Sequence, residues 1–218
     1  MKITKYPQSC LLVETKDKKI LIDPGALEYK EEYFDVWNSV DAILITHKHG
    51  DHCHTEVLQK LNKDIQIYST SEVQRANEIL DISIVKENDT IELDNIKVEV
   101  VRAVHGYQPW LKGELEIHEN VGFIIDDGNH RLYATSDSIC FKNEYKADIL
   151  CTPVTGYGLT MSAFEAALYS KEVGATLTLI IHMDNPTFPP HPEFINEMFT
   201  KHEVEHEILE IGESLEIE

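Results

Sequence analysis

The chain has 218 residues, of which 42% are hydrophobic and 27% are charged, and it carries a formal net charge of −20. This length and composition predict a globular chain with a buried core, organised as a single domain over residues 1–218. So negative a field repels phosphate groups, which argues against nucleic-acid and membrane partners. The start, MKITKYPQSC, lacks the apolar region of a signal peptide, so we expect a cytoplasmic protein whose four cysteines are free thiols.

Short apolar runs separated by turns fill the first third of the chain. They predict two strands over 10–15 and 19–25, joined by a polar turn, and a buried strand over 41–46. Apolar residues at helical spacing predict a helix over 55–61, followed by a strand over 65–70. A second helix is expected over 71–80, with Ser71 as its N-cap.

The middle of the chain is rich in strands, and the last third returns to an alternation of strands and helices. Strands are predicted over 90–104, 121–126, 130–135, 147–153 and 176–183, and strand-like segments over 205–218. Helices are predicted over 161–174, with Thr160 as N-cap, and over 191–202. Frequent hairpins among alternating strands and helices favour mixed sheets covered by helices over a doubly wound parallel sheet.

Residues 45–54, ITHKHGDHCH, place four histidines and an aspartate directly after a buried strand. Imidazole and carboxylate groups are good ligands for zinc and similar divalent ions. His47 and His49 are two apart, so in an extended loop they project to a common side. Asp51 and His52 follow at the expected helix start and point in different directions, which suits a second ion better than the first. The alternative is a polar loop that binds metal only casually, but its place at the end of a buried strand favours a true metal site.

Three further candidate ligands stand just past apolar strands: His105, Asp137 and His182. Each one alone would be read as a turn or capping residue. Together with the histidine cluster they share one position at strand ends, and such ends converge at one edge of a layered fold.

The ordered motifs THKHGDH, VHG, TSDS and IHMD resemble those of the metallo-β-lactamase superfamily over nearly the whole chain. The segment CLLVETKDKKILIDPG is similar to the opening hairpin of that family. PVTGYGLTMSAFEAA and IHMDNPTFPP resemble the small metal-dependent hydrolases related to ascorbate-6-phosphate lactonase. The resemblance implies an α+β fold, a four-layer αββα sandwich of two mixed β-sheets flanked by helices.

The same resemblance implies two divalent ions, most simply Zn²⁺, with Mn²⁺ or Fe as alternatives. The first ion would be held by His47, His49 and His105, the second by Asp51, His52 and His182, with Asp137 as the bridge between them. A hydroxide on the metals would attack the substrate, since metal binding lowers the pKa of water to about 7. Asp51 would be the catalytic residue that orients this water or takes its proton.

Other residues near the motifs are candidates for supporting roles. Gln8 stands where the subgroup often has a histidine, and its amide can donate a hydrogen bond but cannot carry protons. Asp23 resembles a family aspartate that orients a metal ligand, although a turn residue before Pro24 explains it equally well. Ser136 replaces a common glycine before Asp137, which is tolerable if its φ stays negative.

The segment 106–120 has no periodicity and predicts a loop near the metals. Tyr107 and Trp110 could contact substrate there or could only fasten the loop, and Lys112 and His118 are weaker candidates. We expect Cys53 and His54 on the first helical turn after His52, the thiol for packing and the imidazole at the surface or beside the site. A position near the site is also open for His191.

The leading hypothesis is a dinuclear metal-dependent hydrolase acting on a small-molecule ester, lactone, amide or phosphodiester. A lactonase is one option within it. Two alternatives are a di-iron redox enzyme on the same scaffold and a non-catalytic metal-binding or regulatory protein. The sequence leaves a homo-oligomer open.

Overall fold

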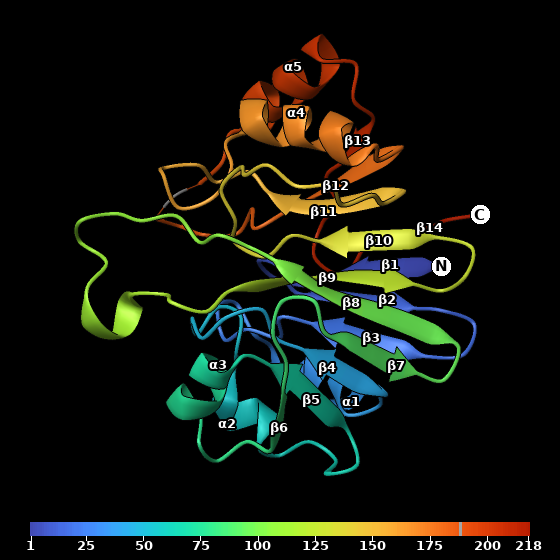
Figure 1. Cartoon of the computed structure of the whole chain (residues 1–218), viewed down its shortest axis with the longest axis vertical. Coiled ribbons are helices and arrows are strands. Elements are labelled where there is room, and N and C mark those ends of the chain that lie inside the picture. Colours follow the sequence, from blue (N-terminus) through green and yellow to red (C-terminus); the bar gives the residue numbers. More distant parts are fainter. Residues whose placement is uncertain (188) are drawn as a thin grey trace.

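Two seven-stranded sheets form the centre of the computed structural model, which describes residues 1–187 and 189–218 (Figure 1). The first sheet has the order β14-β1-β2-β3-β4-β5-β6. Its strands are β1 Lys2–Lys5, β2 Leu11–Glu14, β3 Lys19–Ile22, β4 Ala42–Leu44, β5 Gln66–Ser69, β6 Ile82–Ile84 and β14 Ser214–Glu216. The second has the order β13-β12-β11-β10-β9-β8-β7. Its strands are β7 Thr90–Leu93, β8 Ile96–Arg102, β9 Val121–Asp126, β10 Arg131–Ala134, β11 Ile149–Pro153, β12 Leu177–Ile181 and β13 His206–Glu207.

Each sheet changes from antiparallel to parallel pairing part of the way across. In the first sheet β14, β1, β2 and β3 pair antiparallel, and β3 to β6 pair parallel. In the second, β7 to β10 pair antiparallel and β10 to β13 pair parallel. The parallel strands need crossover connections, which bring their C-terminal ends to a common edge. The expected mixed sheets are therefore confirmed.

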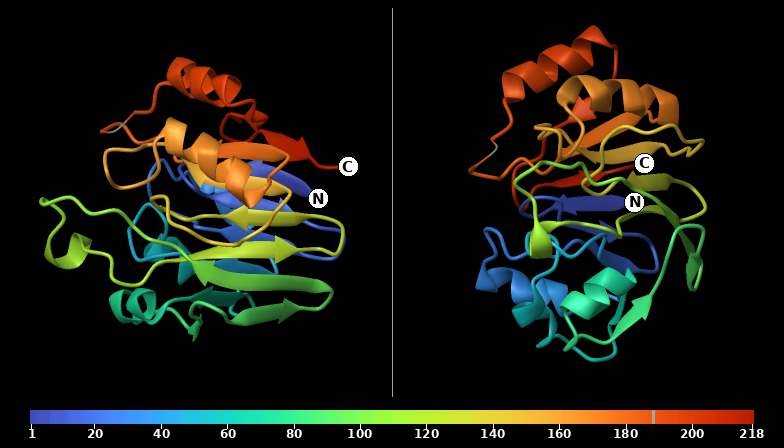
Figure 2. Two further views of the ribbon diagram at one scale, coloured as in Figure 1. Left: turned by 45° about the horizontal axis from the view of Figure 1, so that its top comes forward. Right: turned by 60° about the vertical axis from the view of Figure 1, so that its left-hand side comes forward.

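Helices cover the two outer faces of the sheet pair (Figures 1 and 2). On the first sheet lie η1 Glu31–Tyr33, α1 Phe34–Trp37, α2 Thr55–Leu58 and α3 Ser71–Ala76, and on the second lie α4 Ala163–Val173 and α5 Pro192–Lys201. A further short turn of helix, η2 Gly113–Leu115, lies in the long connection from β8 to β9. No helix in the described part of the chain is long and apolar enough to cross a membrane.

Alternation along the strands fills three separate cores, one between each pair of layers. Leu11 and Val13 of β2 face the second sheet, whereas Leu12 between them packs with the helices of the first. In β9, Phe123 faces the first sheet and Ile124 packs against α4 and α5. Because both faces of each sheet are buried, successive residues of a strand are apolar. This arrangement confirms the four-layer sandwich.

Several element boundaries differ from the sequence prediction. The N-cap of α3 is Thr70, whose hydroxyl accepts from the Val73 amide, and the N-cap of α4 is Ser162, which forms a capping box with Glu165. Assigning these caps to Ser71 and Thr160 was therefore wrong. The sequence prediction also missed β1, β6 and α1, which are only three or four residues long and carry little periodicity.

Candidate metal centre

Seven side chains that could hold metal ions meet where strands of both sheets end. The loop after β4 brings four of them, and the segments after β8, β10 and β12 bring one each. They form three overlapping groups whose ligand atoms lie within 4.8 Å of one another: His47, His49 and His105; His47, His52 and Asp137; and Asp51, His52 and His182. The seven residues singled out from the sequence are thus all brought together. One detail differs, since α2 begins only at Thr55, and the residues from Asp51 to His54 lie in the preceding turn.

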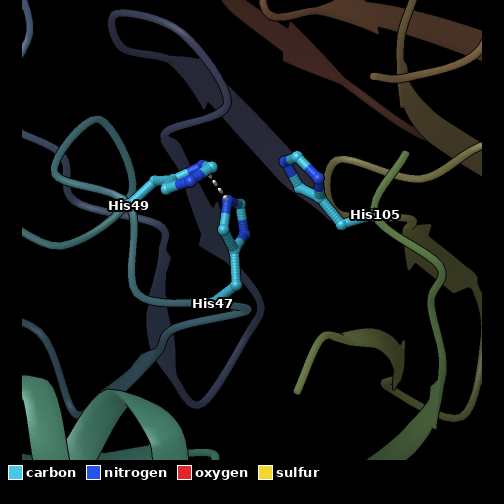
Figure 3. Close-up of side chains that lie close together, drawn as sticks. All are labelled: His47, His49 and His105. Atoms are coloured by element: carbon cyan, nitrogen blue, oxygen red, sulfur yellow. Dashed lines mark hydrogen bonds between the residues drawn. The ribbon is translucent and has the colours of Figure 1, made fainter. Parts of the chain in front are cut away.

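The first group consists of three histidines whose rings lie close together (Figure 3). Each has one ring nitrogen within hydrogen-bond distance of an oxygen atom. Nδ1 of His47 lies 3.0 Å from Oγ1 of Thr46, and Nε2 of His49 lies 2.9 Å from the carbonyl oxygen of Leu115. Nδ1 of His105 lies 2.7 Å from the next carbonyl oxygen in the chain. The two carbonyls only accept, and the Thr46 hydroxyl already donates to Oδ2 of Asp23, so each engaged nitrogen carries the proton and the opposite one keeps its lone pair. The lone-pair nitrogens of His47 and His49 are 3.2 Å apart and suit a shared ion.

The two histidines of the second group also have their outer ring nitrogens within hydrogen-bond distance of oxygen atoms. Nδ1 of His52 lies 2.9 Å from Oδ2 of Asp23, and Nδ1 of His182 lies 2.9 Å from Oγ1 of Thr155. In both rings Nε2 is thereby turned inward, toward the carboxylate of Asp51. The distances to its Oδ2 are 3.9 Å for His52 and 3.4 Å for His182.

Three buried atoms in this centre have no hydrogen-bond partner among the described residues: Nε2 of His52, Nε2 of His182 and Oδ1 of Asp137. The two nitrogens approach Oδ2 of Asp137 to 3.4 and 3.2 Å without the geometry of a hydrogen bond. Buried polar atoms are costly when unsatisfied and almost always have a partner. Imidazole nitrogens and a carboxylate are the donors that divalent transition ions accept, so the residues fit a metal centre.

In the metal-free protein, the histidine rings of the two groups differ in protonation. Burial, with the neighbouring ring of His52 after it, lowers the pKa of His47 well below its usual value, and burial also lowers the pKa of His105. Burial alone would lower the pKa of His182 too, but the carboxylates of Asp137 and Asp51 outweigh it and raise this pKa to about 10. The pKa of His52 is raised for the same reason. An ion entering the second group must therefore displace protons, whereas His47 and His105 are already neutral.

The carboxylates show the opposite effect. Burial would raise the pKa of Asp51, but the rings of His52 and His182 outweigh it and lower this pKa to about 2. The same two rings hold the pKa of Asp137 well below its usual value against the effect of burial. Both carboxylates are ionised at neutral pH, which is the form that binds metal.

Asp23 ties the motif loop to the first sheet. Its Oδ1 accepts from the Thr46 amide at 2.8 Å, and its Oδ2 accepts from the Thr46 hydroxyl at 2.9 Å in addition to Nδ1 of His52. The turn that follows supports Asp51 directly, since a Cβ atom on Gly25 would lie 1.8 Å from the Asp51 carbonyl oxygen. Asp23 therefore does more than form a turn: it fixes the ring orientation of one candidate ligand.

Gln8 joins the centre from the turn between β1 and β2. Its Oε1 accepts from the Asp184 amide at 3.1 Å, which directs its Nε2 toward Oδ2 of Asp51 at 3.5 Å. Its own amide donates to Oδ2 of Asp184, and the same oxygen accepts from Nζ of Lys5 at 2.7 Å. Its carbonyl accepts from the His182 amide at 3.0 Å. Gln8 thus links two candidate ligands through hydrogen bonds and carries no charge.

Four residues in or beside the centre have left-handed backbones although none is glycine. The φ angles are 58° for Gln8, 46° for Asp23, 64° for Ser136 and 60° for His182. The expectation of a negative φ at Ser136 was therefore wrong. Its hydroxyl donates to Oδ1 of Asn120 at 2.6 Å, a contact that offsets part of the backbone strain. Conformations of this kind cost about 1–3 kcal/mol each and concentrate at functional sites.

A cavity of about 290 Å³ opens onto the candidate ligands. The connection from β8 to β9, which extends away from the sheets in Figures 1 and 2, supplies Trp110, Leu111 and Leu115 to its wall. Tyr107 is 63% exposed and is not part of the lining, so of the two expected aromatic contacts only Trp110 is in place.

The weaker candidates lie outside this cavity. Lys112 is exposed, His191 is exposed at the start of α5, and His118 lines a neighbouring hollow. The ring of His54 stands edge-on against Tyr29 at 4.9 Å. Cys53 is buried in the core beneath α2, and burial raises its pKa to about 12, as expected for a packing role.

Sequence reasoning missed Thr155, Leu159, Thr160 and Asn185 as lining residues. Thr155 follows the end of β11, so the strand-end rule that identified the ligands could have found it as well. Leu159 and Asn185 lie in aperiodic segments that carry no such signal.

A family model described as a beta-lactamase superfamily domain matches residues 2–183. A UPF0173 metal-dependent hydrolase of Nanoarchaeum equitans is 30% identical over 165 residues, 72% of each chain. One from Natranaerobius thermophilus is 27% identical over 230 residues and covers both chains completely. The solved structure of Igni18, a metallo hydrolase from the archaeon Ignicoccus hospitalis, has the same fold, with a TM-score of 0.78 at 21% identity over 100% of this chain and 99% of that one. The expected class, a metal-dependent hydrolase, is the one for which these relatives are named. The chain belongs to the metallo-β-lactamase superfamily.

Proposed function

We propose that this metal-dependent hydrolase holds two divalent ions and cleaves an ester, lactone, amide or phosphodiester bond in a small molecule. The observation that carries the proposal is the set of buried atoms on His52, His182 and Asp137 that have no hydrogen-bond partner among the described residues. Satisfying them by metal coordination removes a cost that hydrogen bonds within the protein leave in place. A protein that used these residues only for packing would gain from hydrophobic replacements.

The arrangement supports a division of ligands between the ions. His47, His49 and His105 form one group, and Asp51, His52 and His182 form the other. Asp137 lies within reach of His47 and His52, which belong to different groups, so its carboxylate is suited to bridge them. Nitrogen and carboxylate donors suit zinc first, with manganese and iron as alternatives.

Bound there, two ions would lower the pKa of a shared water to about 7 and polarise the oxygen of the scissile bond. Asp51 is ionised at neutral pH, because its pKa is about 2, and its Oδ2 can orient that water and accept a hydrogen bond from it. Gln8 donates toward the same oxygen and fixes its direction. Since an amide has no titratable proton, Gln8 binds and orients but does not carry the proton away.

The test is metal analysis of protein purified without chelator, combined with ester, lactone, amide and phosphodiester probes. We expect close to two ions per chain and hydrolysis of at least one probe. His49→Ala and Asp137→Ala should each lower metal content and abolish turnover. The matched control is His130→Ala, which removes a histidine from the β9–β10 turn, away from the candidate ligands.

Three results would contradict the proposal. Unchanged metal content in both variants would refute the ligand assignment. Redox-active iron without hydrolysis would favour the di-iron redox alternative, and bound metal without turnover would favour a regulatory role. The cytoplasmic location, the lactonase-like subgroup and a homo-oligomer stay predictions from the sequence.

A further inference from the structure

The wall of the cavity is unusual in its charge. The side chains that line it are the candidate ligands His49, Asp51, His105, Asp137 and His182, together with Gly50, Trp110, Leu111, Leu115, Thr155, Leu159, Thr160 and Asn185. No lysine or arginine is among these described residues. Once its histidines are neutral metal ligands, the positive charge that these lining residues offer a bound molecule comes from metal ions at one end of the cavity.

The lysines near the centre do not supply a cation to the cavity wall. Lys5 is 1% exposed, and its Nζ is already bound to Asp184. Lys48 stands between two candidate ligands in sequence, but its Nζ lies 2.8 Å from Oε1 of Glu72. Lys112 is exposed and outside the lining. An anionic group that entered the cavity away from the metals would lose its hydration without gaining a cation, and that is costly.

The opposite wall is apolar. Trp110 is 53% exposed and Leu115 is 50% exposed, and together with Leu111 and Leu159 they line the cavity. Exposed aromatic and aliphatic side chains grouped around a concave site favour burial of an apolar ligand surface. A volume of about 290 Å³ suits a small molecule only.

Two neighbouring hollows share lining residues with the cavity. One shares Gly50, Asp51 and Asn185 with the cavity and has no lysine or arginine among the described residues that line it. The other contains Lys86 and Arg102 and, among its described lining residues, has His105 alone in common with the cavity. An anionic group away from the metals would therefore have to reach this last hollow to meet a described lysine or arginine.

We propose that the substrate of this site is a small molecule, such as an ester, whose non-reacting part is apolar and uncharged, and that the site rejects analogues that carry an anionic group, such as a carboxylate or phosphate, away from the scissile bond. This inference rests on the proposed function and specifies its substrate class. Hydrolysis of such an ester breaks the acyl C–O bond, adds the hydroxyl of water to the carbonyl carbon and gives the proton to the leaving oxygen. No oxidant or further reactant is needed.

The test uses two esters with the same leaving group and a four-carbon acyl chain, p-nitrophenyl butyrate and p-nitrophenyl hemisuccinate. They differ in the terminal group, which is a methyl in one and a carboxylate in the other. We expect kcat/KM of the zinc-loaded protein to favour the butyrate at least tenfold. Equal rates, or a preference for the hemisuccinate, would overturn the proposal and would indicate that the anion reaches Lys86 and Arg102.

One variant changes the charge of the wall without touching the metal ligands. Leu115→Lys places an ammonium group on a half-exposed position, and the Leu115 carbonyl that accepts from His49 remains. We expect the preference for butyrate to fall at least tenfold in this variant. Leu168→Lys, on an exposed position of α4, adds the same charge elsewhere and should leave the preference unchanged.

A binding measurement keeps the inference separate from the proposed hydrolase activity. Butanohydroxamic acid and the monohydroxamic acid of succinic acid present the same metal-binding group with a methyl or a carboxylate end. Calorimetry on the zinc-loaded protein should show at least tenfold tighter binding of the first. If no ester, lactone, amide or phosphodiester probe is cleaved but this difference in binding is found, the hydrolase proposal fails and the proposed ligand class stands. If the two bind equally, the ligand class is wrong whatever the turnover.

Discussion

Metal binding at the two groups should differ in the protons it releases. The pKa values of His47 and His105 are lowered, so these rings are neutral at about pH 7 and accept an ion without losing a proton. The pKa of His182 is about 10 and that of His52 is also raised, so both rings are protonated and must each lose a proton before they can bind an ion. The first ion should therefore release almost no protons from these rings, and the second should release up to two.

The magnitude follows from the raised pKa of His182. Removing its proton at about pH 7 opposes binding by about 4 kcal/mol, because a pKa of about 10 lies three units higher. The sign is fixed: as pH rises toward this pKa the penalty shrinks. Affinity for the second ion should increase about tenfold per pH unit for each displaced proton. Affinity for the first ion should change far less over the same range.

Isothermal titration with Zn²⁺ measures this effect. Repeating the titration in buffers of different ionisation enthalpy gives the number of protons released at each step. In Asp23→Asn the second step should release fewer protons, because the Asp23 carboxylate helps to raise the pKa of His52. Asp17→Asn, which removes an exposed carboxylate, should change nothing. Equal proton release at the two steps, or a larger release at the first, would refute the reasoning.

Three further predictions concern the support of the centre. Asp23→Asn should lower the affinity for the second ion about 10–100-fold, because it weakens the contact that orients Nδ1 of His52. Competition with a chelating dye measures this affinity, and an unchanged value would leave Asp23 with a turn role only. Gly25→Ala should lower kcat about hundredfold while circular dichroism stays native, since its Cβ would lie 1.8 Å from the Asp51 carbonyl oxygen and must displace that loop; full activity would show that the loop position is unimportant. In metal-free protein, the contribution of His182 to the free energy of unfolding is fully present below about pH 6.5 and is lost as pH rises through about 10. The contribution of Asp51 is present above about pH 3.8 and is lost as pH falls toward 2. Urea unfolding should thus find these contributions greatest between about pH 4 and pH 6.5, and a steady gain in stability above pH 7 would contradict the raised pKa.

The mixed sheets and the candidate ligands could be predicted from short-range patterns in the sequence, whereas the four-layer order was implied by the resemblance to the metallo-β-lactamase superfamily. Two-sided burial makes strands read as continuous apolar runs, and His105 and His182 were found because each follows such a run. Short elements such as β1, with four residues, were missed because they carry too little pattern. The backbone of Ser136 could not be predicted either: its φ is positive, and its side chain is held by a hydrogen bond to Asn120, sixteen positions away, which leaves no local pattern.

The cavity wall was the least predictable part of the site. Trp110 and Tyr107 lie three residues apart in one aperiodic segment, yet only Trp110 lines the cavity. Which side of such a segment faces the metals is decided by contacts such as that between His49 and the Leu115 carbonyl. Contacts of this kind join distant parts of the chain and leave no periodic trace in the sequence.

The placement of the ligands at the ends of both sheets has a consequence for how the protein is made. Each proposed ion takes ligands from the first sheet and from the second, with His182 near the end of the last long strand. A nascent chain that has emerged only as far as β8 therefore offers incomplete coordination shells, which bind metal weakly and exchange it readily. Tight capture of the second ion should therefore come late, after β12 has joined its sheet, because only then does His182 complete that group.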